Sequence, residues 1–390
     1  MKNKEIKKII EKAFVVLTFI NKYIPKKDNV IVLYSNLGFR DNVKSLYDYL
    51  IENKYYEKYR IVCATNEYKK YNEINKNIIF VSPVKGLYYY LKSKYFFYSF
   101  GKYPIYPSKK QIVINLWHGM PLKRIGLMSE QEQNLKYNYF TYVIATSEFF
   151  VPIMAKSFGC SENQVLISGE PRNDSLFKKV NIYQCFNIYD GGKKVIYMPT
   201  FRNSVDLKID NSSPKDTVYE KLKDKEVLKV LNNRLLARNI FLFIKPHPLD
   251  NFDKLFIEYL SNIIYIDDKI INDKNISLYT LLGNMDALLT DYSSVYFDYL
   301  LVNKPIGFII DDIDNYDLKR GFVIDEPVGM MPGEKIRNLE ELDKFFENLS
   351  NNVDKFIEDR KVINNLVNYY KDNKNCERIL KITKILKEEL

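Results

Sequence analysis

Two histidines, His118 and His247, carry all the imidazole chemistry available to this chain of 390 residues. Histidine is the side chain whose ordinary pKa lies nearest neutral pH, so imidazole acid–base chemistry must use one or both of them. Each follows a short run of mainly apolar residues, 112–116 before the first and 240–245 before the second. Ligands of open parallel sheets bind beyond the carboxyl ends of the strands. We therefore expect both histidines to lie at a binding site.

The first histidine lies in the segment WHGMPLKRIG at 117–126, which contains the single tryptophan of the chain. Gly119 permits close approach of a ligand to the backbone, and Pro121 suits a turn or the first position of a helix. Lys123 and Arg124 add hydrogen-bond donors for phosphate. A lone histidine after a strand is more often structural, but the flanking glycine, proline and basic pair favour a functional role.

The second histidine lies in the segment KPHP at 245–248. Prolines on both sides restrict the backbone and orient the imidazole. The alternative is a turn that happens to contain a histidine. That alternative is unattractive because both histidines of the protein take equivalent positions after a strand.

A third segment, DYSSVYFDY at 291–299, joins a strand to the start of a helix. Ser293 and Ser294 would offer their hydroxyls and first-turn amides to a pyrophosphate. The alternative is an ordinary N-cap with Asp298 on a solvated face. Taken alone, the segment favours that alternative.

Two smaller segments end strands with an arginine among turn residues, SGEPRND at 168–174 and MPTFR at 198–202. Both would lie at the ligand-binding ends of their strands. The alternative for Arg172 and Arg202 is a surface salt bridge. It is the stronger one for Arg202, which enters a polar stretch at 202–217 that we expect to be a mobile loop.

Short β-branched or aromatic runs alternate with longer mixed segments, which is typical of βα units and parallel sheets. Seven such runs lie in the first half of the chain, at 30–34, 59–64, 78–81, 95–99, 112–116, 142–145 and 165–168. Five lie in the second half, at 194–198, 240–245, 263–266, 287–290 and 306–310. The polar stretch 181–194, with the turn Asp190-Gly191-Gly192, is the best domain boundary. The sequence predicts an α/β protein with two doubly wound, Rossmann-like domains facing a central cleft.

The composition excludes a disordered chain, because 46% hydrophobic residues suffice for a sizeable core in each domain. Lys+Arg 59 against Asp+Glu 49 gives a net charge of +10, which favours anionic partners. The basic residues are spread along the chain, so a nucleic-acid-binding or basic membrane-binding module is the weaker interpretation. Four distant cysteines without metal-ligand spacing indicate reduced thiols rather than a zinc site.

Lysines flank a short apolar run at 13–20, which is too short to span a bilayer that needs about 20 such residues. No small-residue cleavage site follows, which argues against a secretory signal. Two interpretations have equal weight, a helix lying on an anionic membrane surface and a first helix packed on the protein's own core. The charged stretch 339–390 predicts packed amphipathic helices.

These segments together resemble the CDP-glycerol glycerophosphotransferase family of teichoic acid and capsule biosynthesis, which adopts the GT-B fold. The resemblance rests on WHGMPLKRIG, GEPRND, MPTFR, KPHP and DYSSVYFDY in this order, and continues through Asn303-Lys304-Pro305, KRGF at 319–322 and Pro332-Gly333. Two positions depart from the family pattern. They are Met120, where a small polar residue such as Thr is common, and Glu170, where Tyr is usual.

The resemblance implies transfer of glycerol phosphate, or of another alditol phosphate such as ribitol phosphate, from its CDP donor to a hydroxyl of a lipid-linked saccharide acceptor, with release of CMP. His118 would be the base toward the acceptor hydroxyl, and His247 would contact the pyrophosphate and stabilise the departing CMP. Donor contacts would come from Gly119, Pro121, Leu122, Arg172, Thr200, Phe201, Lys245, Ser293, Ser294 and Asp298. We expect no cofactor and no metal ion, since basic groups and helix ends can neutralise the phosphates.

Four regions follow from these observations. They are an N-terminal amphipathic helix that could contact a membrane (1–28), an acceptor-side Rossmann-like domain (29–185), a CDP-donor Rossmann-like domain (186–350) and C-terminal helices (351–390). The expected partners are a CDP-alditol, a lipid-linked acceptor and an anionic membrane at its cytoplasmic face, with no nucleic acid. The alternative function is a GT-B glycosyltransferase that uses a nucleotide sugar for surface polysaccharide synthesis. The choice between glycerol and ribitol, and between one addition and many, stays open.

Overall fold

A computed structural model describes residues 13–71, 75–130, 132–200, 203–204, 209–210, 216–247, 250 and 252–385. The chain divides into two compact units. The N-terminal unit contains Met1–Gly119, Gly126–Asp174 and Tyr369–Leu390, and the C-terminal unit contains Met120–Ile125 and Ser175–Asn368. This division differs from the expected boundaries after 185 and 350, because the chain passes between the units four times and its last segment returns to the first unit.

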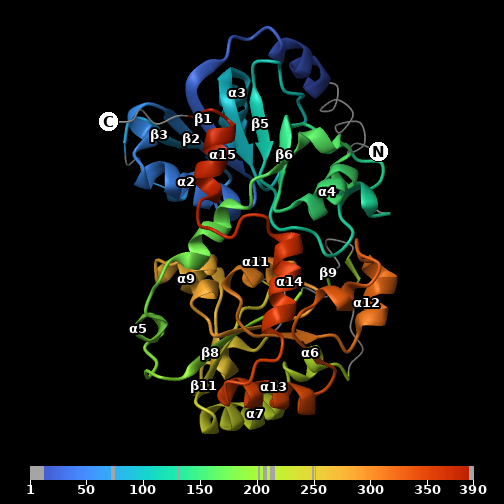
Figure 1. Cartoon of the computed structure of the whole chain (residues 1–390). Coiled ribbons are helices and arrows are strands. Elements are labelled where there is room, and N and C mark those ends of the chain that lie inside the picture. The colour runs from blue at the N-terminus through green and yellow to red at the C-terminus, as the bar shows by residue number, and fades with distance from the viewer. Residues whose placement is uncertain are drawn as a thin grey trace, which may run out of the picture. The chain divides into compact units, whose positions relative to one another are not determined.

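The N-terminal unit is built on a seven-stranded parallel sheet in the order β3-β2-β1-β4-β5-β6-β7 (Figure 1). The strands are β1 (Lys27–Ser35), β2 (Arg60–Thr65), β3 (Ile78–Val81), β4 (Ser93–Tyr98), β5 (Ile112–Asn115), β6 (Tyr142–Ala145) and β7 (Val165–Ile167). All seven strands predicted for this half are confirmed. β1 is buried without interruption from its fourth residue onward, as expected of a central parallel strand covered on both faces.

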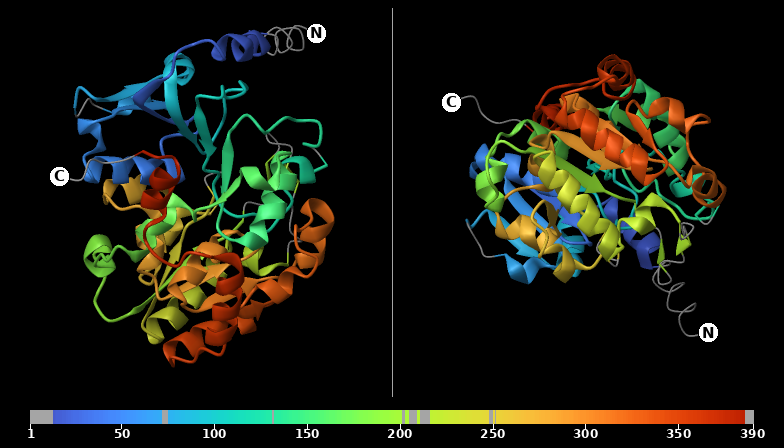
Figure 2. Two further views of the ribbon diagram at one scale, coloured as in Figure 1. Left: turned by 45° about the horizontal axis from the view of Figure 1, so that its top comes forward. Right: turned by 90° about the horizontal axis from the view of Figure 1, so that it is seen from below.

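Four helices of this unit have complete bounds: α2 (Asp41–Glu52), α3 (Pro83–Lys92), α4 (Val151–Phe158) and α15 (Asn375–Ile382). Residues 13–21 are also helical. α15 lies beside α2, although more than 300 residues separate them in the sequence (Figure 1; Figure 2, left). Cys376, Ile379 and Leu380 of α15 belong to the same buried cluster as Leu46 and Leu50 of α2. The C-terminal segment is therefore part of the core of the first unit.

The C-terminal unit is built on a six-stranded parallel sheet in the order β12-β11-β8-β13-β14-β15. Its strands are β8 (Lys193–Met198), β11 (Ile240–Ile244), β12 (Ile263–Tyr265), β13 (Ala287–Thr290), β14 (Ile306–Ile309) and β15 (Glu334–Ile336). The five predicted strands are confirmed. β15 was not predicted, because its sequence EKI carries one buried residue and two charges. Within the expected loop 202–217, β9 (Asn203–Ser204) pairs antiparallel with β10 (Ile209–Asp210), and most of the remaining loop lies outside the described residues.

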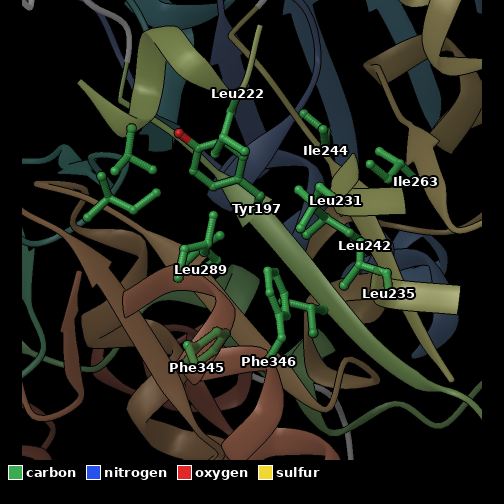
Figure 3. Packing of buried hydrophobic residues seen from close by; sticks show 14 of the residues in the cluster. Tyr197, Leu222, Leu231, Leu235, Leu242, Ile244, Ile263, Leu289, Phe345 and Phe346 are labelled. Atoms are coloured by element: carbon green, nitrogen blue, oxygen red, sulfur yellow. The ribbon is translucent and has the colours of Figure 1, made fainter. Parts of the chain in front are cut away.

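The described residues of this unit form ten helices: α5 (Ile182–Phe186), α6 (Val218–Lys221), α7 (Lys225–Ala237), α8 (Lys254–Ile257), α9 (Asp268–Asp273), α10 (Leu278–Gly283), α11 (Val295–Tyr299), α12 (Ile313–Arg320), α13 (Leu339–Ser350) and α14 (Ile357–Val367). α7 and α13 lie side by side, and Arg238 after α7 donates to Asp343 of α13 at 2.6 and 2.9 Å. Leu231 and Leu235 of α7 and Phe346 of α13 pack with Tyr197 of β8 in the core (Figure 3).

Each sheet changes its winding direction at one point. In the N-terminal unit this point lies between β1 and β4, and in the C-terminal unit it lies between β8 and β13. Loops diverge there, and ligands of doubly wound sheets bind outside the carboxyl ends of the strands at this point. The fold thus confirms two doubly wound domains and marks one expected binding edge in each.

No helix within the described part of the chain is long and apolar enough to cross a membrane.

Candidate functional site

Three segments singled out in the sequence end adjacent strands of the C-terminal sheet. β8 lies between β11 and β13 and is parallel to both. Thr200 follows β8, His247 follows β11 and Ser293 follows β13. Because the strands are parallel, these residues lie at one edge of the sheet, on both sides of its winding point. The structure therefore brings the three segments together although 93 positions separate Thr200 from Ser293 in the sequence.

Thr200 is tied to the third segment by its own polar atoms. Its backbone N–H donates to the two carboxylate oxygens of Asp291 at 2.9 and 3.0 Å, and its hydroxyl donates to the same carboxylate. Thr200 is 8% exposed and Asp291 is 1% exposed. This buried link fixes the turn after β8 against the turn after β13. Phe201 and Arg202, which follow Thr200, lie outside the described residues.

His247 is exposed and lies in a turn closed by Asp250. The His247 N–H donates to Asp250 at 3.2 Å, and the Asp250 N–H donates to the His247 carbonyl at 2.9 Å. Tyr219 donates its hydroxyl to the same carboxylate. Lys245, two residues earlier, is 9% exposed and pairs with Asp268 at 2.9 Å. The turn therefore presents the imidazole at the surface, while the lysine is held by a neighbouring carboxylate.

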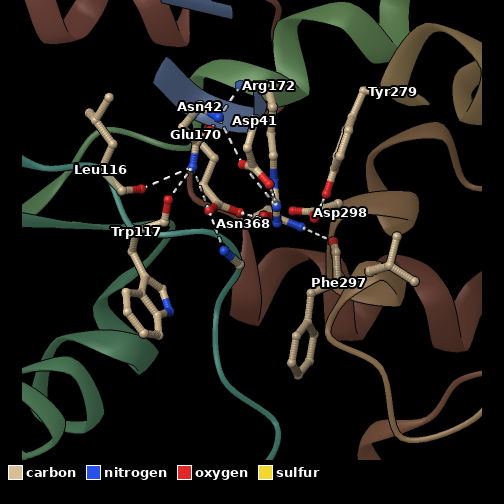
Figure 4. A network of polar contacts seen from close by, with 12 residues as sticks. Asp41, Asn42, Leu116, Trp117, Glu170, Arg172, Tyr279, Phe297, Asp298 and Asn368 are labelled. Atoms are coloured by element: carbon tan, nitrogen blue, oxygen red, sulfur yellow. Dashed lines mark hydrogen bonds and ion pairs between the residues drawn. The ribbon is translucent and has the colours of Figure 1, made fainter. Parts of the chain in front are cut away.

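The two serines of DYSS stand half-buried before the short helix α11. Ser294 occupies the N-cap position and makes no side-chain capping bond, and Ser293 Oγ only weakly accepts from Val295 N at 3.5 Å. The ordinary N-cap considered as an alternative is therefore absent at Ser294. Asp298 is 2% exposed and accepts from the Tyr279 hydroxyl at 2.7 Å, so it does not lie on the solvated face that the same alternative required (Figure 4).

In the N-terminal unit, His118 follows β5 and is enclosed by aromatic rings. The Phe100 ring stacks on its imidazole at 4.6 Å and 20°, and the Trp117 ring lies at 3.8 Å. The pKa of His118 is lowered to about 4, mainly by burial and in part by the charges of Arg172 and Arg40, while the Asp41 carboxylate and the Ser99 backbone oppose the change. Nδ1 is buried with no hydrogen-bond partner among the described residues. His118 is thus a neutral imidazole at neutral pH.

A buried polar network holds the loop that carries His118 (Figure 4). Asn42, at the start of α2, is 0% exposed and donates to the carbonyls of Leu116 at 2.9 Å and Trp117 at 3.1 Å. Glu170, also 0% exposed, accepts the Gly119 N–H at 2.8 Å and the Asn42 amide at 3.2 Å. The network connects the start of α2 with the segments after β5 and β7.

Arg172 belongs to this network and is 5% exposed. Its NH1 binds both oxygens of Asp41 at 3.0 and 3.2 Å, and its NH2 binds Glu170 at 3.2 Å. The sequence predicted a phosphate ligand or a surface salt bridge at this position. The structure shows a buried ion pair with two carboxylates, because Glu170 and Asp41 neutralise the guanidinium from two sides.

The segment WHGMPLKRIG is divided between the two units after Gly119. Within the C-terminal unit, residues 120–125 pair with 321–323 through the Arg124 N–H to Gly321 carbonyl bond at 3.0 Å and the Val323 N–H to Leu122 carbonyl bond at 3.0 Å. Pro121 is buried and Leu122 is 1% exposed. Pro121 and Leu122, which the sequence assigned to donor contact, are therefore buried in a segment that pairs with residues 321–323.

The end of GEPRND holds the C-terminal helix. Asp174 accepts the first amides of α15, Asn375 N and Cys376 N, at 2.9 Å each. Burial raises the pKa of Asp174, and these backbone bonds oppose the rise. Gly169 has φ +71, and a Cβ there would lie 2.1 Å from the Asn375 side chain. This segment therefore has a structural function besides its part in the network around Glu170.

Sequence reasoning missed Asp41, Asn42 and Asp291 as site residues. Asp291 lies inside a segment that was singled out, so its position before the two serines was a usable signal. No signal in the sequence pointed to Asn42, because its hydrogen-bond partners lie 74 and 128 positions away. Within the described residues, no group of three or more His, Cys, Asp or Glu is placed to hold a metal ion.

The chain is similar in sequence to known proteins over most of its length. The model of the family CDP-glycerol:poly(glycerophosphate) glycerophosphotransferase matches residues 16–384. The teichoic acid poly(glycerol phosphate) polymerase of Staphylococcus epidermidis is 27% identical over 381 residues, covering 85% of this chain and 48% of the polymerase. The teichoic acid glycerol-phosphate transferase of Staphylococcus aureus is 26% identical over 405 residues, covering 96% and 97%. The chain thus spans about half the length of the polymerase and nearly all of the transferase.

The structure of the wall teichoic acid polymerase TagF is similar in fold. Its TM-score is 0.76 at 22% identity, and the match covers 98% of this chain and 95% of that one. With two parallel-sheet α/β units, this similarity confirms the GT-B fold class. The chain belongs to the CDP-glycerol:poly(glycerophosphate) glycerophosphotransferase family.

Proposed function

We propose that this chain transfers glycerol phosphate from CDP-glycerol to a hydroxyl of a lipid-linked acceptor in teichoic acid synthesis, releasing CMP. Membership of the family supports the reaction class. The observation that carries the proposal is that Thr200, His247 and Ser293 end three adjacent strands at the winding point of one sheet. That edge is where a doubly wound sheet binds a nucleotide.

On the donor side, we assign the pyrophosphate of CDP-glycerol to His247, Ser293 and Ser294. The imidazole is exposed, and the Ser294 hydroxyl is not used to cap its helix. Thr200 and Asp298 would hold the backbone of the donor site in place, because both are buried and hydrogen-bonded to other residues of the unit. The ion pair with Asp268 would hold the Lys245 side chain in place at this end of the sheet.

On the acceptor side, His118 would act as the general base. A base must be deprotonated before the reaction, and a pKa of about 4 keeps the imidazole neutral at neutral pH while also making it a weaker base than one with a pKa near 7. The acceptor oxygen would then bond to the phosphorus that carries glycerol, and the bond from that phosphorus to the oxygen of CMP would break. Positioning and charge neutralisation supply most of the catalysis in such transfers.

The test is incubation of the purified chain with CDP-glycerol and a synthetic lipid-linked saccharide, with CMP as the readout. His118→Ala should lower CMP release by about 10²–10⁴-fold, which is the contribution expected of a general base. Its circular dichroism spectrum should match that of the parent chain. Near-normal turnover in His118→Ala would contradict its role as the base. Release of UDP from UDP-sugars without CMP from CDP-glycerol would favour the nucleotide-sugar alternative.

We also propose that the N-terminal helix contacts an anionic membrane surface, at the cytoplasmic face where CDP-glycerol would be used. Val15, Val16 and Phe19 are 71%, 56% and 60% exposed. The helix is attached through its polar end, since Asn21 is 0% exposed and donates to Gln111 at 2.7 Å. An apolar face left open beside lysines suits an interfacial helix rather than one packed on the core.

The double variant Val16→Ser with Phe19→Ser should weaken sedimentation with vesicles that contain phosphatidylglycerol. The matched control is Val362→Ser on α14, a residue that is 65% exposed in the other unit. Equal sedimentation of the double variant and the parent chain would place the membrane contact on another surface.

A further inference from the structure

We propose that Asn42 and Glu170 form a buried clamp that sets the backbone on both sides of His118, which makes them positioning residues for the transfer step. The proposal rests on the proposed function of His118 as the base. The peptide unit before His118 contains the Trp117 carbonyl, and the unit after it contains the Gly119 N–H. Asn42 donates to the first at 3.1 Å, and Glu170 accepts from the second at 2.8 Å.

Asn42 is placed to hold several segments at once. Its amide hydrogens face three oxygens, the carbonyls of Leu116 and Trp117 and one carboxylate oxygen of Glu170, at 2.9, 3.1 and 3.2 Å. Its own oxygen accepts the Arg172 backbone N–H at 3.0 Å. The bonds to Leu116, Glu170 and Arg172 are buried, so the loss of any of them leaves a buried polar group without compensation. One side chain therefore fixes the segments after β5 and β7 relative to α2 (Figure 4).

Glu170 completes the clamp through its two oxygens. One accepts the Gly119 N–H and the Asn42 amide, and the other accepts from Arg172 NH2 at 3.2 Å. Arg172 is held on its other side by Asp41 at 3.0 Å. The Gly119 N–H, the Asn42 amide and the Arg172 guanidinium are all hydrogen-bond donors, and a carboxylate is the side chain that accepts at both of its positions.

The backbone that the clamp holds does not adopt a relaxed conformation. Trp117 has φ +49, in the left-handed region that bulky residues rarely occupy, and Gly119 has φ +120. Such conformations persist where the surroundings over-determine them, and they cluster at functional sites. The clamp meets this requirement, and it holds the two residues that flank the imidazole.

Glu170→Gln tests the clamp with almost no change of shape. If the amide oxygen faces Gly119, the amide nitrogen faces Arg172 NH2, so two donors meet. If the amide is turned, its nitrogen faces the Gly119 N–H and the Asn42 amide. Neither orientation satisfies all partners, so the loop should shift. We expect kcat for CMP release to fall by about 10–100-fold, as displacements of about 1 Å do, with KM for CDP-glycerol within about twofold. The matched control is Glu226→Gln, since that side chain is 78% exposed.

Two readouts separate positioning from a purely structural role. Trp117 is the single tryptophan, so its fluorescence reports on the clamped loop. The NMR titration of the His118 imidazole reports on its surroundings without turnover. We expect both signals to change in Glu170→Gln and to be preserved in Glu226→Gln. If the parent chain releases no CMP from CDP-glycerol, the proposed function fails, while these two signals still test the clamp.

Asn42→Asp is the second variant. It places an oxygen where the amide hydrogens now face the carbonyls of Leu116 and Trp117, so the loss of kcat should exceed that of Glu170→Gln. Parental kcat in either folded variant would overturn the proposal. So would a lower melting temperature with unchanged kcat per folded molecule, or failure of both variants to fold, since the network would then serve stability alone.

Discussion

The imidazole of His118 should titrate far below neutral pH, and replacing Phe100 should raise its pKa. That pKa lies at about 4, against an ordinary value of 6.5, and burial is its first cause. The difference of about 2.5 corresponds to about 3 kcal/mol, at about 1.36 kcal/mol for each pKa unit. At pH 7 about one imidazole in a thousand is then protonated, compared with about one in four at the ordinary pKa.

Phe100→Ala removes the ring that stacks on the imidazole at 4.6 Å. Water would then reach one face of His118 and stabilise the charged form, so its pKa should rise by about 1, with about 6.5 as the ceiling. Phe100→Leu keeps apolar cover and should leave the pKa unchanged. Arg40, whose guanidinium lies 5.2 Å from the Phe100 ring, carries a charge that lowers the pKa, so its approach could not cause a rise.

The assay is NMR of the chain labelled with ¹³C-histidine, in which two imidazole signals are expected and His247→Gln assigns them. Fluorescence of Trp117 gives a second reading, because an imidazolium quenches an adjacent indole and the two rings are 3.8 Å apart. Activity should stay level from pH 8 to about pH 5 and fall to half near pH 4. A His118 signal that titrates near 6.5 in the parent chain, or an unchanged pKa in Phe100→Ala, would refute the reasoning.

The same shift has a consequence for stability. Because the folded chain keeps His118 neutral between pH 6.5 and about pH 4, the unfolded chain binds more protons in that window. Stability should therefore fall as the pH drops through it, and this loss should be smaller in Phe100→Ala. Urea unfolding at pH 7 and pH 4.5 measures the difference.

Two further predictions concern buried contacts. Gly169→Ala should lower the melting temperature by several degrees, because a Cβ at φ +71 would lie 2.1 Å from Asn375, whereas Gly329→Ala should be neutral because nothing lies within 4 Å of it. Equal melting temperatures for the two variants would contradict this packing. Thr200→Val removes the hydroxyl that donates to Asp291 and should cost about 1 kcal/mol in urea unfolding, with a raised KM for CDP-glycerol. An unchanged KM would separate this link from donor binding.

The sequence predicted the strands well because parallel strands buried on both faces leave continuous apolar runs. The five residues of β11, IFLFI, are all buried, and such a run is visible without a structure. β15 left no such run, since it is a three-residue edge strand. The domain boundaries were less predictable, because Met120–Ile125 and Tyr369–Leu390 each belong to the unit that does not contain their sequence neighbours.

For the site, the sequence predicted where several functional side chains lie, but it did not predict which side chains pair with them. Both histidines follow strands as expected, and the serines of DYSS stand at the predicted edge. Arg172 was assigned to phosphate because the carboxylates that pair with it, Asp41 and Glu170, were not recognised as its partners. A cation's partner depends on which loops meet in space, and Asp41 lies 131 positions away from Arg172. Pairings of this kind cannot be obtained from one sequence.

The most direct test of the central claim is product analysis after incubation with CDP-glycerol and a synthetic lipid-linked saccharide. We expect one CMP for each glycerol phosphate added to the acceptor, and loss of both products in His118→Ala and His247→Ala. Parental yields in those variants, or no CMP under conditions in which a nucleotide sugar is consumed, would contradict it.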